Sequence, residues 1–335
     1  MRLLVTGGAG FIGANFVHSC LARRPGTAIT VLDALTYAGS REALAAVADD
    51  IRLIEGDVAD SHVVTAAVAE LDPRTDAVVH FAAETHVDNA LAEPEPFVRS
   101  NVVGTFSVLE AVRAHQVRLH HISTDEVYGE LALNAPQRFT ESSPYRPSSP
   151  YSATKAAADH LVRSWVRSYG VRATISNCSN NYGPYQHVEK FIPRQITNLL
   201  TGRRAVLYGS GVNVRDWIHV DDHNSAVWQI LSNGEIGRTY LIGADGERDN
   251  RSVLQTILRL MDHEPDDFDR VADRPGHDLR YAIDPSRLRD ELGWSPHYTD
   301  FEAGLRETID WYRTHRSWWE PLKENAEARY AQRGG

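Results

Sequence analysis

The sequence predicts an α/β fold built on a doubly wound parallel sheet, followed by a smaller C-terminal lobe. Two observations support this prediction. An apolar strand at residues 2–6 runs directly into a glycine-rich turn and an apolar-periodic helix that reaches about residue 22. Predicted strands then alternate with helical segments as far as residue 176. Such alternation is typical of a parallel sheet with helices on both faces.

The remaining elements follow in order along the chain. Further strands of the sheet are expected at 28–32, 51–55, 76–81, 117–123 and 172–176, with a return strand near 238–243. Helices with apolar residues at helical spacing are expected at 61–71, 96–114 and 151–169. The C-terminal part is expected to hold helices that end near residues 200 and 231, that start at residue 250, and that span about 285–292 and 301–313.

The turn after the first strand carries the spacing G-x-G-x-x-G at Gly8, Gly10 and Gly13, and Gly7, Gly10 and Gly13 recur every third residue. Glycine suits this turn because the chain bends tightly, the backbone approaches a pyrophosphate, and the helix packs close to the strand. Asp33 follows Gly13 by 20 residues, at the end of the second strand, where an acid binds the adenine-ribose hydroxyls. The sequence therefore predicts a Rossmann-type site for NAD rather than NADP, whose 2′-phosphate the acid would repel.

Ligands of such a sheet bind at the carboxyl ends of its strands. Asp57 follows the third strand and is expected to flank the adenine, while the small residues Ala82 and Ala83 let the chain pass close to the cofactor. The cofactor contacts expected along this edge are Gly7, Gly10, Phe11, Ile12, Gly13, Asp33, Leu35, Thr36, Asp57, Val58, Phe81, Ala82, Ala83, Tyr151 and Lys155.

The candidate catalytic residues lie between residues 117 and 155. Thr124, Asp125 and Glu126 end a strand, and Tyr151 and Lys155 stand four residues apart on one face of a helix. A lysine ammonium close to a phenol favours the phenolate, so we expect Lys155 to lower the pKa of Tyr151 and make it a general base. The two carboxyl groups offer a second acid and base if their surroundings separate their pKa values.

Composition excludes several classes of function. The 335 residues carry a net charge of −10 without a block of basic residues, which argues against a nucleic-acid surface. The two cysteines, Cys20 and Cys178, lack metal-ligand spacing and fit a reducing cytoplasm. No signal peptide and no apolar run of membrane-spanning length is found. His219 and His223 match H-x-x-x-H, but they lie where a strand enters a helix, and we expect no metal site.

Several motifs together resemble a known family. The spacing of Gly7, Gly10 and Gly13, the Tyr151 and Lys155 pair and the hydroxyl of Thr124 are similar to extended short-chain dehydrogenases/reductases. The segments 124–129 (TDEVYG), 180–185 (NNYGPY) and 274–278 (RPGHD) resemble those of the dTDP-glucose 4,6-dehydratases, over residues 1 to 322. Asp125 next to Glu126 is the most specific feature, because epimerases of the same fold have smaller residues there.

The resemblance implies a mechanism of proton and hydride transfers. Tyr151, made acidic by Lys155 and by the cofactor's positive ring, takes the proton of the C4 hydroxyl of glucose while hydride passes from C4 to NAD. Thr124 hydrogen-bonds the C4 oxygen. Glu126 then removes the C5 proton, and Asp125 protonates the departing C6 hydroxyl. Hydride returns to C6, which gives a nucleotide-linked 4-keto-6-deoxy-glucose.

The resemblance also implies contacts outside this catalytic group. Ser100 and Asn181 are expected to contact the cofactor, and Arg215 and Arg274 suit a diphosphate because a guanidinium fork matches phosphate oxygens. The substrate pocket is expected to contain Thr85, His86, Thr124, Asp125, Glu126, Asn180, Lys190, Phe191, Val206, Tyr208, Arg215, Asn250, Arg274 and His277. Asn89 and Asn177 depart from the family, which often has arginine at both positions.

These features divide the chain into an NAD-binding domain at 1–176 with the return strand, a mainly substrate-binding lobe at 177–322, and a frayed tail at 323–335. A homodimer through helices 96–114 and 151–169 is expected from their apolar stripes and from the family. Three functional alternatives stay open: a UDP-glucose 4,6-dehydratase, a 4-epimerase, and a non-catalytic NAD-binding regulator. The sequence does not separate dTDP from UDP, and it does not indicate which pathway uses the product.

Overall fold

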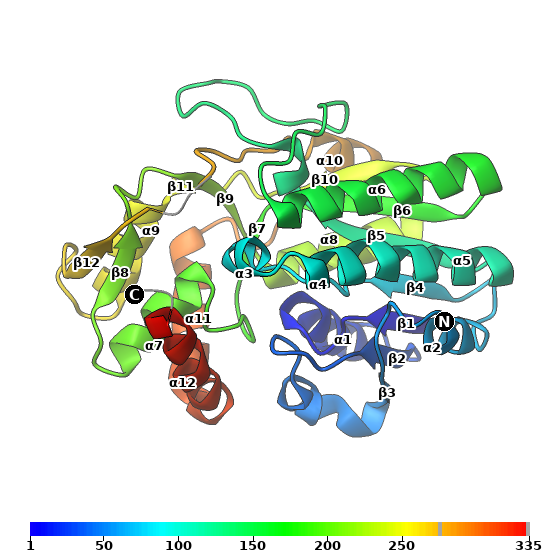
Figure 1. Cartoon of the computed structure of the whole chain (residues 1–335), viewed down its shortest axis with the longest axis horizontal. Helices are drawn as coiled ribbons and strands as arrows, with labels where there is room; N and C mark the ends of the chain where they lie inside the picture. Colours follow the sequence, from blue (N-terminus) through cyan, green and yellow to red (C-terminus); the bar gives the residue numbers. More distant parts are fainter. Residues whose placement is uncertain (274–276, 333–335) are drawn as a thin grey trace.

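The computed structural model describes residues 1–273 and 277–332, the last four of these by their backbone alone (Figure 1). Seven parallel strands form the large sheet in the order β10-β6-β5-β4-β1-β2-β3. The strands are β1 (Arg2–Thr6), β2 (Ala28–Asp33), β3 (Ile51–Glu55), β4 (Ala77–His80), β5 (Arg118–Thr124), β6 (Ala173–Cys178) and β10 (Thr239–Ile242). The predicted sheet, including its return strand, is therefore confirmed. Its order reverses between β1 and β4, where doubly wound sheets bind their ligands.

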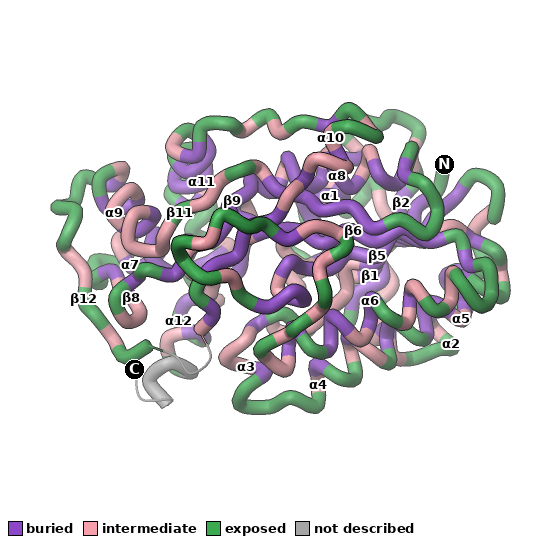
Figure 2. Tube along the Cα trace, turned by 90° about the horizontal axis from the view of Figure 1, so that it is seen from above, coloured by how far each residue is buried: buried purple, intermediate pink, exposed green. Residues whose placement is uncertain are grey.

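Successive side chains of β1 point to opposite faces of this sheet. Leu3 and Val5 pack with α1 (Phe11–Arg23) and α8 (Val220–Asn233). Leu4 packs on the other face, which is covered by α2 (Ser61–Val68), α5 (Thr105–His115) and α6 (Pro150–Tyr169). All three side chains are fully buried, and each contributes about 1.5–3 kcal/mol to folding. Figure 2 shows the strands as the buried centre of the molecule, with exposed loops around them.

The predicted helix at 96–114 is interrupted at its start. A short helix, α4 (Glu95–Phe97), is followed by a π-helical segment, η2 (Val98–Gly104), and then by α5. Asn101 lies in the π-helical segment, and its side-chain oxygen accepts a 2.8 Å hydrogen bond from the backbone N–H of Glu84. Its amide nitrogen donates to the Thr154 hydroxyl at 2.9 Å. Asn101 thus joins the loop after β4 to the helix that carries Tyr151.

The remaining elements form a second group beside the large sheet, on the left in Figure 1. It contains a three-stranded sheet, a two-stranded sheet and four helices around two apolar clusters. The larger cluster includes Ile192, Leu305 and Tyr312, and the smaller one includes Ala205, Leu207 and Leu254. Its members are β7 (Asn180–Tyr182), α7 (Phe191–Leu200), β8 (Ala205–Tyr208), β9 (Val214–His219), β11 (Glu247–Asp249), α9 (Asn250–Leu260), β12 (Phe268–Val271), α11 (Phe301–Thr314) and α12 (Arg316–Gln332). The division of the chain into two domains at residue 176 stays a prediction.

The prediction of a frayed tail from residue 323 is wrong as far as Gln332, because α12 continues to that residue. Trp319 is fully buried, and its indole N–H donates to the Tyr312 carbonyl oxygen at 2.7 Å. Lys323 is buried as well and pairs with Glu327 at 2.7 Å. One side of α12 is buried and the other is polar and exposed. Polar residues make up most of the segment, and for this reason its sequence suggested a frayed tail. Residues 333–335 lie outside the described part of the chain.

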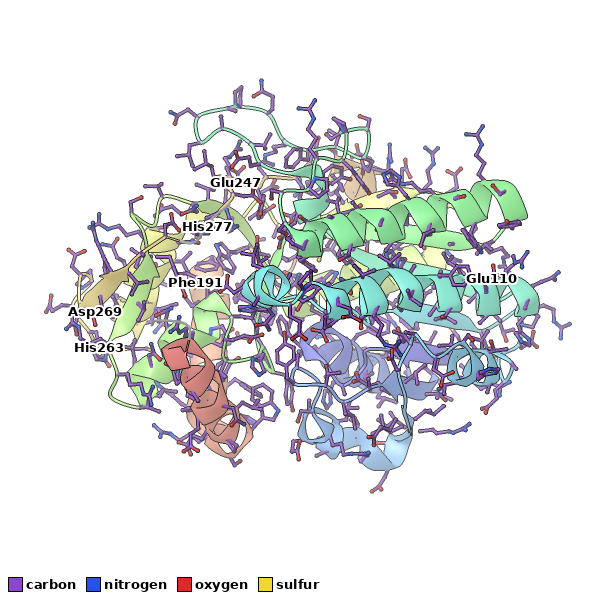
Figure 3. The ribbon with its side chains drawn as sticks, viewed as in Figure 1. Glu110, Phe191, Glu247, His263, Asp269 and His277 are labelled. Atoms are coloured by element: carbon purple, nitrogen blue, oxygen red, sulfur yellow. The ribbon has the colours of Figure 1, made fainter. Side chains whose placement is uncertain are left out.

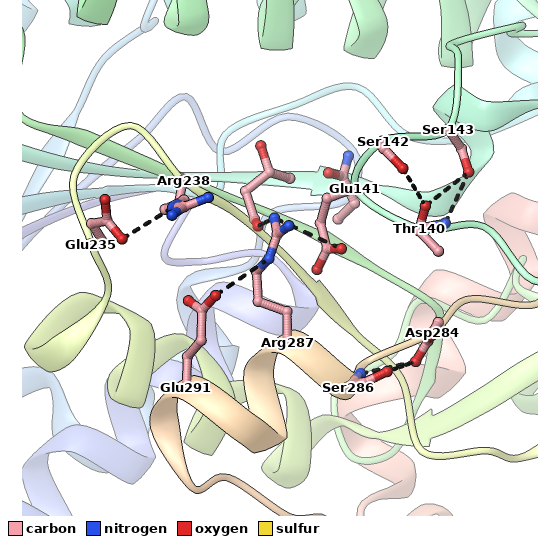
Figure 4. Close-up of polar contacts among 12 residues, drawn as sticks. Thr140, Glu141, Ser142, Ser143, Glu235, Arg238, Asp284, Ser286, Arg287 and Glu291 are labelled. Carbon is pink, nitrogen blue, oxygen red and sulfur yellow. Dashed lines mark hydrogen bonds and ion pairs between the residues drawn. The ribbon is translucent and has the colours of Figure 1, made fainter.

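The long loop between β5 and α6 is held by contacts with the C-terminal half of the chain. Arg287 of α10 (Ser286–Leu292) lies 3.8 Å from Glu141 of the loop and 3.6 Å from Glu291 (Figure 4). The same guanidinium donates to the Thr239 carbonyl oxygen of β10 at 3.2 Å. The middle of this loop is therefore joined to α10 and, through Arg287, to β10. Within the described ranges, no helix is long and apolar enough to cross a membrane.

Candidate active site

A cavity of about 300 Å³ lies along the carboxyl ends of the parallel strands. It receives residues that follow or end β1 to β6, as expected for a sheet of this topology. The predicted site residues that line it are Gly7, Gly10, Phe11, Ile12, Gly13, Asp33, Thr36, Asp57, Val58, Phe81, Ala82, Ala83, Thr85, Ser100, Thr124, Asp125, Glu126, Tyr151, Lys155, Asn180, Asn181 and Lys190.

Close backbone contacts require glycine at two positions of the turn after β1. Gly7 has a φ of +70°, and a Cβ atom there would lie 2.5 Å from the backbone nitrogen of Ala82. A Cβ atom on Gly13 would overlap the carbonyl oxygen of Gly7. The start of α1 therefore packs directly on the turn, and its first N–H groups have no side-chain cap. A helix N-terminus of this kind suits a phosphate group.

Asp33 ends β2 and points its carboxylate at the same turn. It is 8% exposed, and its two oxygens accept hydrogen bonds of 2.8 Å from the backbone N–H groups of Ala9 and Leu35. Burial raises the pKa of this carboxyl, while the two N–H donors lower it. The carboxylate is thus oriented at the edge of the cavity, and with the two glycines it fits the adenosine half of a dinucleotide.

Tyr151 and Lys155 lie on the cavity side of α6 and are both buried. The Lys155 ammonium donates a 2.7 Å hydrogen bond to the Ile122 carbonyl oxygen of β5. The pKa of Tyr151 is raised well above its ordinary value, first by burial and then by the charge of Glu126, while the Thr124 side chain lowers it. The prediction that the Lys155 ammonium favours the Tyr151 phenolate stays a prediction, because the overall shift is dominated by burial.

The candidate acid–base pair has two different environments. Asp125 is 1% exposed, and the pKa of its carboxyl is raised well above the ordinary range by burial, by Glu126 and by Asp216, against the effect of Arg215. One of its oxygens accepts from the Thr124 hydroxyl at 3.3 Å, and the other has no hydrogen-bond partner among the described residues. Glu126 is only partly buried and lines the cavity. The surroundings of Asp125 therefore favour its protonated form, beside a second carboxyl group that opens to the cavity.

Some predicted residues lie outside the lining of this cavity. Leu35 lines a neighbouring hollow instead, and His86 is buried at the start of α3 (Val87–Ala92). The other residues in this group belong to the second group of elements: Phe191, Val206, Tyr208, Arg215, Asn250 and His277. Figure 3 shows Phe191 and His277 among these elements, beside the large sheet. Arg274 lies outside the described residues. Leu35 as a cofactor contact and the others as substrate contacts stay predictions.

Arg215 illustrates how this second group reaches the catalytic residues. Its guanidinium lies over the Tyr281 ring at 4.2 Å and donates to the Asp278 carbonyl oxygen at 2.9 Å. Its positive charge lowers the pKa of the Asp125 carboxyl. Arg215 therefore favours the ionised form of Asp125, although burial and the neighbouring carboxyl groups outweigh this effect.

Several residues of the site were not predicted from the sequence. Cys178, Glu84 and Glu189 all line the cavity. The pKa of Glu84 is raised by burial and by the charge of Glu189, and it is lowered by Lys190. Cys178 and Glu84 follow or end predicted strands, so the rule that ligands bind at strand ends contained the signal that would have found them. Glu189 sits in an irregular loop for which no sequence pattern points to the cavity.

A family model described as GDP-mannose 4,6 dehydratase matches residues 4–308 of the chain. A dTDP-glucose 4,6-dehydratase of Mycolicibacterium smegmatis is 74% identical over 334 residues, which cover 100% of both chains. The chain belongs to the dTDP-glucose 4,6-dehydratase family. A member of this family from Mycobacterium tuberculosis is 73% identical over the same length. The resemblance found in the sequence motifs is thus confirmed.

Solved structures extend this likeness to the fold. A dTDP-glucose 4,6-dehydratase of Streptomyces venezuelae with NAD and TYD bound has a TM-score of 0.91 and 45% identity, and the match covers 96% of this chain and 100% of that one. A UDP-glucose 4-epimerase of Thermus thermophilus in complex with NAD has a TM-score of 0.85 and 32% identity, with 94% and 100% of the two chains covered. The dTDP-glucose 4,6-dehydratase family therefore shares its Rossmann-type fold with epimerases, and the fold alone does not separate the two activities.

Proposed function

We propose that this protein binds NAD⁺ in the cavity and converts dTDP-glucose to dTDP-4-keto-6-deoxy-glucose by removing water. The observation that carries the proposal is the buried Asp125 beside Glu126, at the end of β5 and in the same cavity as Tyr151. Dehydration needs an acid and a base in addition to the base that a simple oxidation needs. The names of the relatives described above support the same substrate.

The residues fit the cofactor at both of its ends. The glycine turn and the start of α1 would hold the pyrophosphate, Asp33 the adenine ribose, and Tyr151 and Lys155 the nicotinamide ribose. When bound, NAD⁺ supplies the chemistry of taking a hydride from the sugar and giving it back at another carbon. The chain itself must orient the sugar, exclude water and move three protons.

Tyr151 is the residue we assign to the proton of the C4 hydroxyl. Its phenol is buried, and Tyr151 and Thr124 line the same cavity, so we place the reacting sugar oxygen at a point between the two hydroxyl groups. A sugar oxygen at that point meets both groups. The high pKa of Tyr151 falls when positive charge enters the cavity or when negative charge leaves it, so the phenol becomes a base only in the loaded site.

Asp125 and Glu126 are the residues we assign to the loss of water. The raised pKa of Asp125 keeps its carboxyl protonated, and the carboxyl oxygen without a partner is available to give that proton to the C6 hydroxyl. Glu126 lines the cavity and would remove the C5 proton, which the ketone at C4 makes acidic. Arg215 and the other predicted residues of the second group would hold the nucleotide part of the substrate, so that the two groups of elements act as cofactor domain and substrate lobe.

A homodimer is proposed as the working form. Large apolar side chains are exposed along α3, η2, α5 and α6: Leu91, Val98, Val103, Phe106 and Tyr169. α5 and α6 lie side by side, so the two helices of a second copy would cover these side chains as a four-helix bundle (Figure 1). Light scattering should give twice the chain mass, and Phe106→Glu should shift the measured mass toward that of the monomer.

The cysteines support a location in a reducing cytoplasm. Both of them, Cys20 and Cys178, are buried free thiols.

The test of the proposed reaction is incubation of the purified protein with dTDP-glucose in deuterated water, without added reductant. Loss of one water, a ketone at C4, deuterium at C5 and no net NADH would support the proposal. Reaction with UDP-glucose and not with dTDP-glucose would keep the chemistry and change the nucleotide. An epimer of the sugar without loss of water would overturn the proposed dehydration and favour a 4-epimerase. The same NMR and mass spectra distinguish all three outcomes.

A further inference from the structure

Asp159 is a buried charged residue that the proposed reaction does not use. It follows Lys155 by four residues on α6, as Lys155 follows Tyr151, so the three side chains lie on one face of the helix. Asp159 is 0% exposed. A carboxylate without contact to water costs several kcal/mol unless charged or polar partners compensate it. Its partners therefore indicate what it does.

The partners of Asp159 come from three segments around the catalytic group. One of its oxygens accepts from the Tyr145 hydroxyl at 2.7 Å and from the side-chain amide of Asn177 at 3.0 Å. The other oxygen lies 3.2 Å from a ring nitrogen of His121. The amide of Asn177 also donates to the carbonyl oxygen of Thr124 at 3.1 Å. The carboxylate is thus connected through one side chain to the end of β5 where the candidate catalytic residues begin.

The charges around Lys155 leave Asp159 as its compensating anion. Burial lowers the pKa of Lys155, while Asp159 and Cys178 raise it. Burial also raises the pKa of the Cys178 thiol to about 12, so this group is uncharged near neutral pH. His121 and His80 face Lys155 from β5 and β4, and burial lowers the pKa of both imidazoles, which favours their neutral forms. Burial raises the pKa of Asp159, but His121, Lys155 and the Tyr145 hydroxyl lower it below its ordinary value. The Arg163 guanidinium donates a 2.7 Å hydrogen bond to the Tyr145 hydroxyl.

We propose that Asp159 is a positioning residue for catalysis, whose buried carboxylate keeps Lys155 in its ammonium form and, through Asn177, fixes the end of β5 that carries Thr124. Lys155 as an ammonium can stabilise the Tyr151 phenolate, while a neutral Lys155 cannot. Asp159 is therefore required for the acid–base function of Tyr151 without touching the substrate. The catalytic part of this inference rests on the proposed function, but its electrostatic part does not.

The chain offers a direct test because it contains only three lysines, Lys155, Lys190 and Lys323. Labelling with [ε-¹³C]lysine gives three NMR signals, which Lys190→Arg and Lys323→Arg assign. We expect Asp159→Asn to lower the titration midpoint of Lys155 by about one unit or more, the effect of removing an opposite charge that lies one helical turn away on the same buried face of α6. The two other midpoints serve as internal controls. A Lys155 midpoint that stays in place would overturn the proposal, whatever substrate the protein uses.

The catalytic part of the proposal is tested by measuring kcat, KM and the pH dependence of activity with dTDP-glucose. Asp159→Asn should lower kcat by roughly tenfold to a hundredfold with little change in KM, and its activity should decline at a lower pH on the alkaline side, where Lys155 loses its proton. Tyr145→Phe removes a hydrogen bond to the same carboxylate but keeps its charge, so it should leave the Lys155 midpoint and the alkaline limb in place. Asp159→Glu should partly restore the Lys155 midpoint and the alkaline limb of the pH profile. Equal losses of kcat in all three variants would indicate a purely structural role.

Asp159→Ser is smaller and leaves room for water, so it replaces Asp159→Asn should the amide variant not fold. An inactive wild-type protein would contradict the proposed function and would leave the NMR result standing on its own.

Discussion

Glu126 lies next to Asp125 at the end of β5, and its negative charge adds to burial in raising the pKa of the Asp125 carboxyl. Two adjacent carboxyl groups that both face water would ionise together near pH 4. Here Asp125 is almost without contact to solvent and Glu126 opens to the cavity. Unequal surroundings of this kind separate an acid from a base within one dipeptide.

The first prediction concerns the roles of these two carboxyl groups. Asp125→Asn should stop the loss of water, because an amide cannot protonate the C6 hydroxyl, and turnover should fall by about 10²–10⁴. Oxidation at C4 should continue, so absorbance of reduced cofactor at 340 nm should accumulate after mixing with dTDP-glucose.

Glu126→Gln is the matched variant for the C5 proton. It should also accumulate reduced cofactor, but deuterium from the solvent should no longer enter C5 in recovered substrate. Unchanged water loss in the Asp125→Asn, Glu126→Gln double variant, which should still bind NAD and substrate, would show that other groups carry these steps.

The second prediction concerns stability. The pKa of Asp125 in the folded chain is above its ordinary value of 3.8, so the folded protein binds the proton more tightly than the unfolded chain does. Stability is therefore lost as the pH rises from about 4 through the folded pKa. Asp125→Asn removes this loss and should raise the Tm by about 1–3 °C at pH 8. Calorimetry at pH 5 should give a smaller difference, and a difference that grows toward low pH would contradict the assignment.

The third prediction concerns the choice of cofactor. Asp33 presents a buried, oriented carboxylate where the adenine ribose is expected. Asp33→Ser should weaken NAD binding by roughly tenfold to a hundredfold, the value of one or two hydrogen bonds to a charged group, and should allow NADP to bind. Isothermal titration with both cofactors measures the change. Asp57→Asn is the control: Asp57 pairs with Arg99 at 2.9 Å in the same edge of the cavity, and its loss should leave the preference for NAD intact.

Strand positions and most of the cavity were predictable from sequence because both follow local rules. The run of apolar residues before Gly7 defines β1, and the parallel sheet then brings Asp33, Asp57 and Thr124 to one edge. The pKa of Tyr151 was not predictable from the Tyr151 and Lys155 spacing. It depends on burial and on charges such as Glu126, which folding brings from elsewhere in the chain.

Asp159 and Glu189 were missed for a related reason. Asp159 has the spacing of an ordinary helical residue, and only its contacts with His121, Tyr145 and Asn177 distinguish it. The departure at Asn177, visible in the sequence, acquires a meaning only with these contacts: the amide bridges Asp159 and the Thr124 carbonyl oxygen. Single-residue patterns carry no information on such tertiary networks.

The final prediction concerns the C-terminal segment, which the sequence suggested was frayed. Trp319 is fully buried in the apolar cluster that includes Ile192, Leu305 and Tyr312, so Trp319→Ala should lower the free energy of unfolding by about 3–5 kcal/mol. Trp318, its partly buried neighbour, provides a matched control, and Trp318→Ala should cost distinctly less because part of that side chain already meets water. Urea unfolding followed by circular dichroism measures both. Equal and small losses in the two variants would mean that α12 does not pack on the second group of elements in solution, and the tail would then be frayed as its sequence suggests.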